Sequence, residues 1–285
     1  MVALPDLQGR RILVTGATNG IGLEAALALG AAGAELILVG RDAQRTEAAR
    51  KAVQERAKVE VVGMLCDFAS QASIRAFAAD FCARYDRLHV LVNNAGTVNA
   101  ERKLTEDGIE ATFAVNHLGY FLLTQLLLER VRAGAPARIV NVSSTGHYGA
   151  TLDFNDLGFE KDYDIMAAYR RSKLGNVLYT RLLARKLAGS GVTVNALHPG
   201  GVATNIWTGA PGWAAPLLWL AKRFMLSPAQ GAETITYLAA SPEVEGKTGL
   251  YFEKNRERAP SELAQNDALA ERLWVESERL TGLSR

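Results

Sequence analysis

Residues 11–22 read RILVTGATNGIG, a short apolar run that leads directly into a glycine-rich loop. Gly16, Gly20 and Gly22 follow the spacing G-x-x-x-G-x-G. Glycine permits a tight turn and lets the backbone approach a pyrophosphate closely. Helical spacing begins near Leu23, and the start of a helix offers free N–H groups and the positive end of its dipole. The stretch therefore predicts a strand, a phosphate-binding loop and a helix. The alternative interpretation is a glycine-rich turn that holds no ligand.

The same succession of an apolar run and a helix-like segment recurs along the whole chain. Continuous Val- and Ile-rich runs are typical of strands that are covered on both faces of a sheet. They occur at 11–15, 35–40, 59–65, 88–93, 137–143, 191–197 and 248–252. Between them, apolar residues recur at helical spacing over 22–32, 70–84, 108–133 and 170–188. The alternation predicts one α/β domain over residues 1–285, with a doubly wound, about seven-stranded parallel sheet flanked by helices on both faces.

Charge and cysteine content exclude several classes of protein. The chain of 285 residues carries 32 Lys and Arg against 30 Asp and Glu, a formal net charge of +2. Such a balance gives no general attraction to nucleic acid or to anionic lipid. Cys66 and Cys82 form no Cys-x-x-Cys pair, which argues against a disulfide framework and a zinc site and fits a reducing compartment. With no secretory signal and no run of 18 apolar residues, we expect a cytoplasmic protein without a metal site, a nucleic-acid partner or an integral membrane segment.

The end of the second predicted strand, LVGRD (38–42), bears on the choice of dinucleotide. The residue that reads the ribose lies about 20 positions beyond the glycine loop. A protein that prefers NAD usually has a carboxylate at this strand end, whereas this chain has Gly40 followed by Arg41. A guanidinium can bind a 2′-phosphate bidentately, so the pattern favours NADP. Two alternatives remain: Arg41 is a solvated residue paired with Asp42, or Asp42 binds the ribose hydroxyls of NAD.

The sharpest candidate for catalysis is YRRSK (169–173). Tyr169 and Lys173 are four positions apart, so on a helix they lie on one face, one turn from each other. A free phenol has a pKa of about 10. A nearby ammonium favours the phenolate by Coulomb attraction and is expected to lower that pKa. The pair is therefore a candidate general acid or base.

Taken in chain order, these and further motifs resemble the short-chain dehydrogenase/reductase superfamily over nearly the full chain. The motifs are TGATNGIG (15–22), CDF (66–68), NNAG (93–96), NHLG (116–119), IVNVSS (139–144), YRRSK (169–173) and HPGGVAT (198–204). The resemblance implies a Rossmann fold and a catalytic set of Asn116, Ser144, Tyr169 and Lys173. With Arg41, it implies dinucleotide binding by Gly16, Thr18, Asn19, Gly20, Ile21, Asp67, Phe68, Asn94, Ala95, Gly96, Tyr169, Lys173, Pro199, Gly200, Val202 and Thr204.

The implied reaction is hydride transfer between NADPH and a carbonyl carbon, or its reverse from an alcohol. Tyr169 donates the proton, Ser144 binds the substrate oxygen and Lys173 binds the nicotinamide ribose. Asn116 is implied to hold a water that links Lys173 to solvent. The neighbouring Ser143 points to the opposite side of its strand and is expected to bond backbone.

Other residues carry weaker signals. Neither serine lies in a G-x-S-x-G elbow, which argues against a serine hydrolase. His117, His147 and His198 lack metal-ligand spacing and are interpreted as packing or loop residues.

Within the superfamily the chain looks most like the retinol-dehydrogenase-like branch. LVGRD, NHLGYFLLTQLLL (116–128) and the long segment between Ser144 and Tyr169 carry this likeness. Membrane-bound members of that branch have a hydrophobic N-terminal anchor, and we expect none here. The family also implies a homodimer or a higher homo-oligomer.

Substrate recognition is expected in two long irregular stretches, about 145–165 and 203–226. The second contains Trp207, Trp213, Trp219 and Phe224, which favours an apolar carbonyl or alcohol; packing against the core or a dimer contact is the alternative use of the same residues. Besides an NADP-dependent carbonyl reductase or alcohol dehydrogenase, two functions remain open: a reductase of a conjugated C=C bond, and a dinucleotide-binding sensor with vestigial activity. The complete set of four catalytic residues favours an enzyme.

Overall fold

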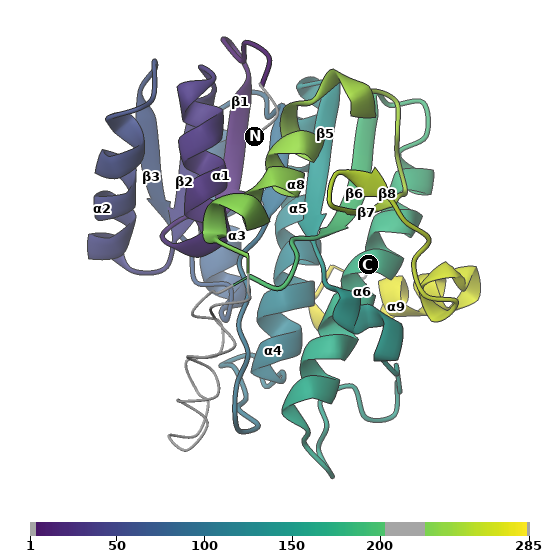
Figure 1. Ribbon diagram of the computed structural model, residues 1–285. Helices are drawn as coiled ribbons and strands as arrows, with labels where there is room; N and C mark the ends of the chain where they lie inside the picture. The colour runs from purple at the N-terminus through teal and green to yellow at the C-terminus, as the bar shows by residue number, and fades with distance from the viewer. Residues whose placement is uncertain (1–3, 203–225, 284–285) are drawn as a thin grey trace.

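The structure, a computed structural model, describes residues 4–202 and 226–283. In these residues one sheet lies between two layers of helices (Figure 1). Its strands are β1 (Arg11–Thr15), β2 (Glu35–Gly40), β3 (Val61–Leu65), β4 (Val90–Asn93), β5 (Ala137–Val142), β6 (Val192–His198), β7 (Tyr251–Glu253) and β8 (Arg256–Glu257). The helices are α1 (Gly20–Ala31), α2 (Ala43–Gln54), α3 (Gln71–Arg84), α4 (Ala111–Phe113), α5 (Gly119–Ala133), α6 (Ile165–Lys186), α8 (Pro228–Ala240) and α9 (Asp267–Leu280).

The sheet confirms the predicted parallel, doubly wound arrangement. The strand order is β3-β2-β1-β4-β5-β6-β7-β8, and the pairs from β3 to β7 are all parallel. The sheet has eight strands where about seven were expected, because the two-residue β8 returns antiparallel to β7. Chain order reverses direction between β1 and β4, which are neighbours in the sheet. In open α/β sheets, ligands bind outside the carboxyl ends of the strands at such a switch point.

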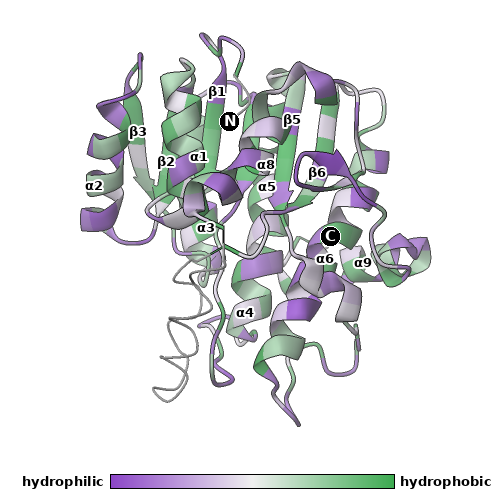
Figure 2. Cartoon of the chain, viewed as in Figure 1, coloured by the Kyte–Doolittle hydropathy of each residue, from purple (hydrophilic) through white to green (hydrophobic). Residues whose placement is uncertain are grey.

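Each central strand is buried on both faces, which explains the continuous apolar runs. In β1, Leu13 packs into the core under α3, α5 and α6, whereas Ile12 and Val14 pack into the core under α1, α2 and α8. Figure 1 shows α1 and α8 in front of the sheet and α5 behind it. In Figure 2 the apolar residues gather in the sheet, while polar residues lie on loops and on the outer side of α2. The two cores fix the strand ends from which the site is built.

One long helical stretch, Ala111–Ala133, is long and apolar enough to cross a membrane among the described residues. It comprises α4, a π-helical turn at Ala114–Leu118 and α5. In its most apolar window, 72% of the residues are buried inside the protein. The position of α5 against β4, β5 and α3 accounts for its apolar character as a core helix.

Of the two stretches expected to recognise substrate, the one at 203–226 lies outside the described residues except for Leu226. The other begins with a 3₁₀ turn, Thr145–Gly149, and runs irregularly to α6. Arg171 of α6 is 4% exposed and donates hydrogen bonds to the carbonyls of Thr151, Asp156 and Leu157 in this stretch. Its guanidinium also lies 3.7 Å from the ring centroid of Phe159. The stretch is therefore fastened to the helix that carries Tyr169 and Lys173.

Candidate functional site

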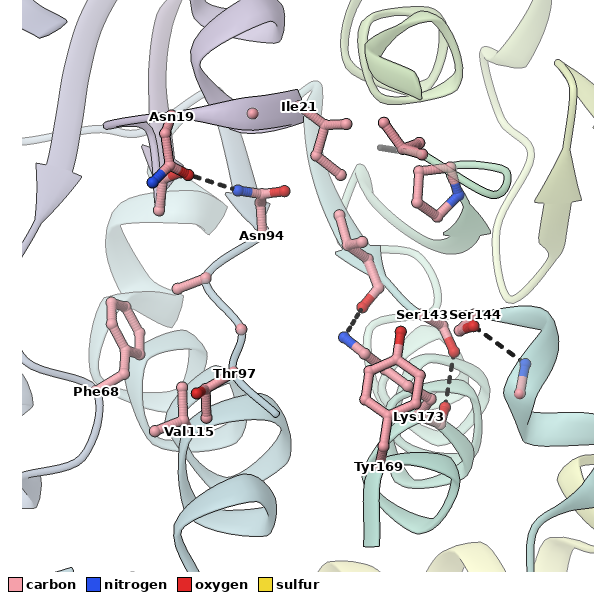
Figure 3. A pocket seen from close by; sticks show the side chains of 18 of the residues that line it. Asn19, Ile21, Phe68, Asn94, Thr97, Val115, Ser143, Ser144, Tyr169 and Lys173 are labelled. Carbon is pink, nitrogen blue, oxygen red and sulfur yellow. Dashed lines mark hydrogen bonds between the residues drawn. The ribbon is translucent and has the colours of Figure 1, made fainter. Parts of the chain in front are cut away.

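A cavity of about 1020 Å³ lies at the carboxyl ends of the strands, where the switch point predicts a ligand. Figure 3 shows Asn19 and Ile21 on one wall, Phe68, Thr97 and Val115 on a second, and Tyr169, Lys173, Ser143 and Ser144 gathered on a third. Every described residue that the sequence assigned to dinucleotide binding lines this cavity, as do Ser144, Tyr169 and Lys173. Asn116 does not line it, and Thr204 lies outside the described residues.

The glycine loop is pressed against the NNAG segment that follows β4. A Cβ on Gly16 would lie 2.8 Å from Cα of Ala95, and one on Gly22 would lie 2.4 Å from Nδ2 of Asn94. Asn94 donates from this amide to the carbonyls of Thr15, at 2.8 Å, and Gly16, at 3.2 Å. The backbone N–H groups of Asn94 and Ala95 both donate to Oγ1 of Thr15. Gly16 and Gly22 are thus required for this close approach, which holds two cavity walls in fixed register.

The start of α1 faces this cavity without a side-chain cap. Asn19, its N-cap residue, accepts no hydrogen bond through its side chain, and Gly20 adopts a left-handed φ of 56°. Other helices that begin after a loop are capped by a side chain, namely α2 by Asp42, α3 by Ser70, α6 by Asp164, α8 by Ser227 and α9 by Asn266. The first N–H groups of α1 therefore remain available to an anion. Together with the glycine loop, they fit a pyrophosphate.

The end of β2 presents two exposed guanidinium groups to the cavity, those of Arg41 and Arg45. Neither makes an ion pair within the described part of the chain. The carboxylate of Asp42 caps α2 by accepting a 2.8 Å hydrogen bond from N–H of Arg45. A Cβ on Gly40 would lie 2.4 Å from both Cγ2 of Thr18 and Oγ1 of Thr46. This strand end therefore has no room for a carboxylate side chain as the backbone stands.

The cavity walls between these features include the other residues predicted for the dinucleotide. Asp67 is exposed after β3, and Phe68 is buried beside it. Beyond β6, Gly200 has a φ of +90°, and a Cβ there would meet the Leu226 side chain at 2.3 Å. A β-bridge between Val202 and Leu226 closes this turn.

Ser144, Tyr169 and Lys173 converge where β5 meets α6. The Tyr169 phenol hydrogen-bonds with the Ser144 side chain, whose Oγ also accepts a 3.0 Å hydrogen bond from N–H of Gly146. Nζ of Lys173 lies 5.7 Å from the centroid of the Tyr169 ring and donates to the Val142 carbonyl at 3.1 Å. The arrangement places a hydroxyl pair and an amine within one small region of the cavity.

Burial controls the protonation of this group. It raises the pKa of the Tyr169 phenol, and the hydrogen bond with Ser144 opposes that rise. It lowers the pKa of the Lys173 amine to about 7. The sequence predicted that the Lys173 ammonium would lower the phenol pKa. That prediction is wrong for this structure, because desolvation disfavours the charged form of each group and is the largest influence on both pKa values.

Asn116 lies on the π-helical turn and is fully buried. Its side-chain amide donates to the Thr97 carbonyl at 3.0 Å and to Oγ of Ser172 at 3.1 Å, while Oδ1 accepts from N–H of Thr97 at 2.8 Å. Ser172 is the neighbour of Lys173 on α6. The Asn116 side chain therefore ties a cavity wall to the helix that carries Tyr169 and Lys173.

Two of the three histidines behave as packing or loop residues, as expected. His117 is fully buried and pairs with Ser277 at 3.1 Å. His147 pairs with the Ser144 carbonyl at 2.6 Å and accepts from N–H of Ser261 at 3.1 Å. His198 differs, because it lines the cavity.

Among the basic residues that line the cavity, sequence reasoning gave no site role to Arg45, Arg170 and His198. Arg45 lies four positions after Arg41, a spacing that could have identified it. Arg170 follows Tyr169 directly but carried no motif of its own. Among the described residues, no cluster of His, Cys, Asp and Glu could hold a metal ion.

Comparisons with known proteins agree with this geometry. The family model described as short chain dehydrogenase matches residues 10–214. The chain is 43% identical to human retinol dehydrogenase 13 and 42% identical to human retinol dehydrogenase 14. Each alignment covers 97% of this chain and 86% or 88% of the relative.

Solved structures give the same result. A protein of Mycobacterium paratuberculosis superposes with a TM-score of 0.80 at 31% identity, over 98% of this chain and 96% of that one. A complex of RhlG with NADP from Pseudomonas aeruginosa superposes with a TM-score of 0.69 at 26% identity, over 88% of this chain and 97% of that one. The fold, the cavity and these relatives together show that the chain is an oxidoreductase of the short-chain dehydrogenase/reductase family, similar to the retinol dehydrogenases.

Proposed function

We propose that this protein interconverts a carbonyl and an alcohol with NADP(H), on an apolar substrate, through Tyr169, Ser144 and Lys173. One observation carries the proposal: these three side chains meet at one cavity, and the same cavity is lined by the glycine loop and by Arg41 and Arg45. A protein that only sensed a dinucleotide would need the glycine loop to bind it, but it would not need these three side chains to lie together.

The reaction needs both a bound dinucleotide and side chains of this protein. A nicotinamide dinucleotide supplies or accepts the hydride. In the reducing direction, the Tyr169 hydroxyl gives its proton to the substrate oxygen, and Ser144 binds the same oxygen as negative charge develops on it. Lys173 then returns a proton to the phenolate and holds the ribose. In the oxidising direction, the Tyr169 phenolate removes the hydroxyl proton.

Three features of this chain, and one relative, support NADP over NAD. Arg41 and Arg45 are exposed guanidinium groups on one rim of the cavity, suited to a 2′-phosphate. The Asp42 carboxylate is already engaged as a helix cap. A Cβ at Gly40 would clash with Thr18 and Thr46, so the carboxylate that binds a 2′-hydroxyl is missing. The RhlG relative was solved with NADP.

An apolar substrate is supported by relatives named for retinol and by the Trp-rich composition of 203–226. We further propose a cytosolic homo-oligomer. Cys66 and Cys82 form no disulfide among the described residues, which is compatible with a reducing compartment. Recovery of most of the native protein in washed membranes would contradict this location, and a monomer in size-exclusion chromatography with light scattering would contradict the assembly.

The experiment that tests the function is a cofactor-oxidation assay over matched ketones, aldehydes, enones and alcohols, with the products identified. The proposal predicts turnover of apolar carbonyls or alcohols with NADP(H). Saturation of only the C=C bond in enones would instead identify a conjugated-bond reductase. Tight cofactor binding without turnover of any member would favour a sensor.

A further inference from the structure

One face of α6 carries a charged group to which the proposed reaction gives no role. Met166, Tyr169, Arg170 and Lys173 all line the cavity. Their spacing of i, i+3, i+4 and i+7 places the four side chains on one face of a helix. Tyr169 and Lys173 belong to the proposed catalytic set, and Met166 is apolar. The guanidinium of Arg170 is therefore an unexplained charge on the same helix face as the proton donor.

The Arg170 side chain starts beside the catalytic hydroxyls and extends along the 3₁₀ turn that follows β5. A Cβ on Gly146 would lie 3.4 Å from Cγ of Arg170. The same Cβ would lie 3.4 Å from Oγ of Ser144 and 3.6 Å from Cε1 of Tyr169. A Cβ on Gly149 would lie 3.7 Å from Nη1 and 3.8 Å from Cζ of Arg170. The charged end of the side chain thus lies at the far end of the turn from the catalytic hydroxyls.

No acidic side chain that the structure describes neutralises Arg170. Its guanidinium is exposed and makes no hydrogen bond or ion pair within residues 4–202 and 226–283. The segment before α6 contains five acidic residues, and none of them lines the cavity. Four are engaged elsewhere: Asp153 and Asp156 act on Arg171, Glu160 pairs with Arg102, and Asp164 caps α6. The fifth, Asp162, is exposed. The charge of Arg170 is therefore left for another molecule.

The charges of the cavity are distributed unevenly between its two ends. Among the described residues, the carboxylates that line it are those of Asp42 and Asp67, which follow β2 and β3 at the end proposed for the dinucleotide. The stretch 203–226, which is expected to recognise substrate, contains Lys222 and Arg223 but no Asp or Glu. The residues available to the substrate therefore offer positive charge and no opposing carboxylate.

Apolar side chains also lie at the substrate end. Met166 and Val115 line the cavity, and Val115 packs against the core behind it. Figure 3 shows Val115 across the cavity from Tyr169. A substrate that reaches Tyr169 and Arg170 together must therefore be apolar over part of its length.

We propose that Arg170 binds a carboxylate of the substrate, so that the protein prefers an apolar carbonyl or alcohol that carries one acidic group. The inference rests on the proposed carbonyl–alcohol reaction and narrows its substrate class. The reacting oxygen binds Tyr169 and Ser144, and the carboxylate pairs with the guanidinium farther along the turn. A guanidinium is planar and can donate to both oxygens of a carboxylate. A neutral analogue of the same shape lacks this pairing, which makes Arg170 a specificity-determining residue.

Matched substrates test this assignment. Each pair consists of an oxo acid and its methyl ester, and the pairs differ in the length of the apolar chain between the carbonyl and the carboxyl group. In the wild type, we expect kcat/KM for the acid to exceed that for its ester roughly 10- to 100-fold at the best length. The preference is expected in KM rather than kcat, because the carboxylate contact is the same in the ground state and the transition state.

Variants of the arginine assign the effect. Arg170→Met keeps an unbranched side chain without the charge, so kcat/KM for the acid is expected to fall to that of the ester. Arg170→Lys keeps the charge but not the planar donor pair, so part of the preference is expected to remain. Arg185→Met is the control, because Arg185 is exposed on the same helix and does not line the cavity. It is expected to keep the wild-type preference.

A second readout does not need turnover. With saturating NADP⁺, calorimetric titration compares 4-phenylbutanoate with its neutral amide as unreactive probes. We expect the wild type to bind the carboxylate roughly tenfold more tightly than the amide, and Arg170→Met to bind both equally. Added salt should weaken only the carboxylate, because the pair is partly exposed.

The possible failures give different results. Equal kcat/KM for acids and esters in the wild type overturns the carboxylate subsite, and a preference that survives in Arg170→Met overturns the assignment to this residue. A weaker Kd for NADP(H) in Arg170→Met would assign the guanidinium to the dinucleotide and also overturn the proposal. If the wild type turns over no carbonyl or alcohol, the proposed function fails, and the phenylbutanoate titration still decides whether Arg170 binds a carboxylate.

Discussion

The hydroxyl of Ser143 donates a 2.7 Å hydrogen bond to the backbone carbonyl of Lys173. Two further bonds, from Nζ of Lys173 and Nδ2 of Asn176, reach the Val142 carbonyl at 3.1 and 3.2 Å. These contacts tie the end of β5 to α6. They fix Ser144, on one element, relative to Tyr169, on the other, before any substrate arrives.

The two adjacent serines should therefore respond differently to substitution. Ser143→Ala leaves the Lys173 carbonyl without this donor in a buried site, so we expect a loss of about 1–2 kcal/mol in the free energy of unfolding and a smaller change in kcat. Ser144→Ala should mainly lower kcat, since its hydroxyl faces the cavity beside the phenol. Urea unfolding and steady-state kinetics on one substrate measure both effects. A larger kcat loss in Ser143→Ala than in Ser144→Ala would reverse the assignment.

The lowered pKa of Lys173, about 7 in the folded protein, predicts a pH-dependent stability. Between about pH 7 and 10.5 the unfolded chain binds more protons at this residue than the folded one does, so its contribution to stability rises with pH. Lys173→Met should consequently stabilise the protein most below pH 7. The difference in the free energy of unfolding between this variant and the wild type should shrink by a few kcal/mol toward pH 10, at about 1.4 kcal/mol per pKa unit.

Urea unfolding at pH 6, 8 and 10 checks this expectation. Lys161→Met is the matched control, because Lys161 is exposed and outside the cavity. A difference between wild type and Lys173→Met that stays constant with pH would mean that burial does not shift the amine.

The choice between NADP(H) and NAD(H) should depend on Arg41 and Arg45, which follow β2 at the edge of the cavity. Charge-assisted hydrogen bonds contribute about 1.5–3 kcal/mol. Arg41→Ala is therefore expected to weaken NADP(H) roughly 10- to 100-fold, with little effect on NAD(H). Arg45→Ala should show the same selectivity to a smaller degree. Titrations of both dinucleotides give the Kd values, and Arg56→Ala, an exposed arginine beyond the far end of α2, serves as control. Equal affinities for the two dinucleotides in the wild type would refute NADP preference.

Arg171 should matter for the segment that it fastens. Arg171→Met removes its hydrogen bonds to the 151–157 carbonyls and its contact with Phe159. We expect a loss of about 2–3 kcal/mol in stability and faster hydrogen exchange confined to 150–164. Arg170→Met, one position away and exposed, should leave exchange in that segment unchanged. Equal exchange in both variants would show that the arginine does not hold the segment.

The elements with strong local signals could be predicted from the sequence. The apolar runs at 11–15 and 35–40 match β1 and β2 residue for residue, because burial on both faces selects apolar residues between Arg11 and Thr15 and after Glu35. The segment predicted as a helix from 170 begins earlier, at Ile165, where Asp164 provides the cap. The two-residue β8 and the π-helical turn at 114–118 had no signal, since such short elements depend on their neighbours.

Some residues of the candidate site could likewise be predicted from the sequence, and others could not. Residues within contiguous motifs, such as the glycine loop and the Tyr169–Lys173 pair, could be placed because short-range geometry brings them together. The place of His198 beside Glu253 could not, since it arises from the register of two strands about 50 positions apart. The direction of the Tyr169 pKa shift was also beyond the sequence, which gives no measure of how deeply the phenol is buried.

The central claim is that Tyr169 is the proton donor. Tyr169→Phe removes one hydroxyl and keeps the ring, so packing and cofactor Kd should change little. The most direct measurement is kcat of this variant on an accepted carbonyl substrate. Tyr163→Phe is the control, because Tyr163 is also partly buried but does not line the cavity. The account predicts a fall in kcat of about 10²–10⁴-fold in a folded protein with normal cofactor affinity. Near-normal turnover in that protein would contradict it.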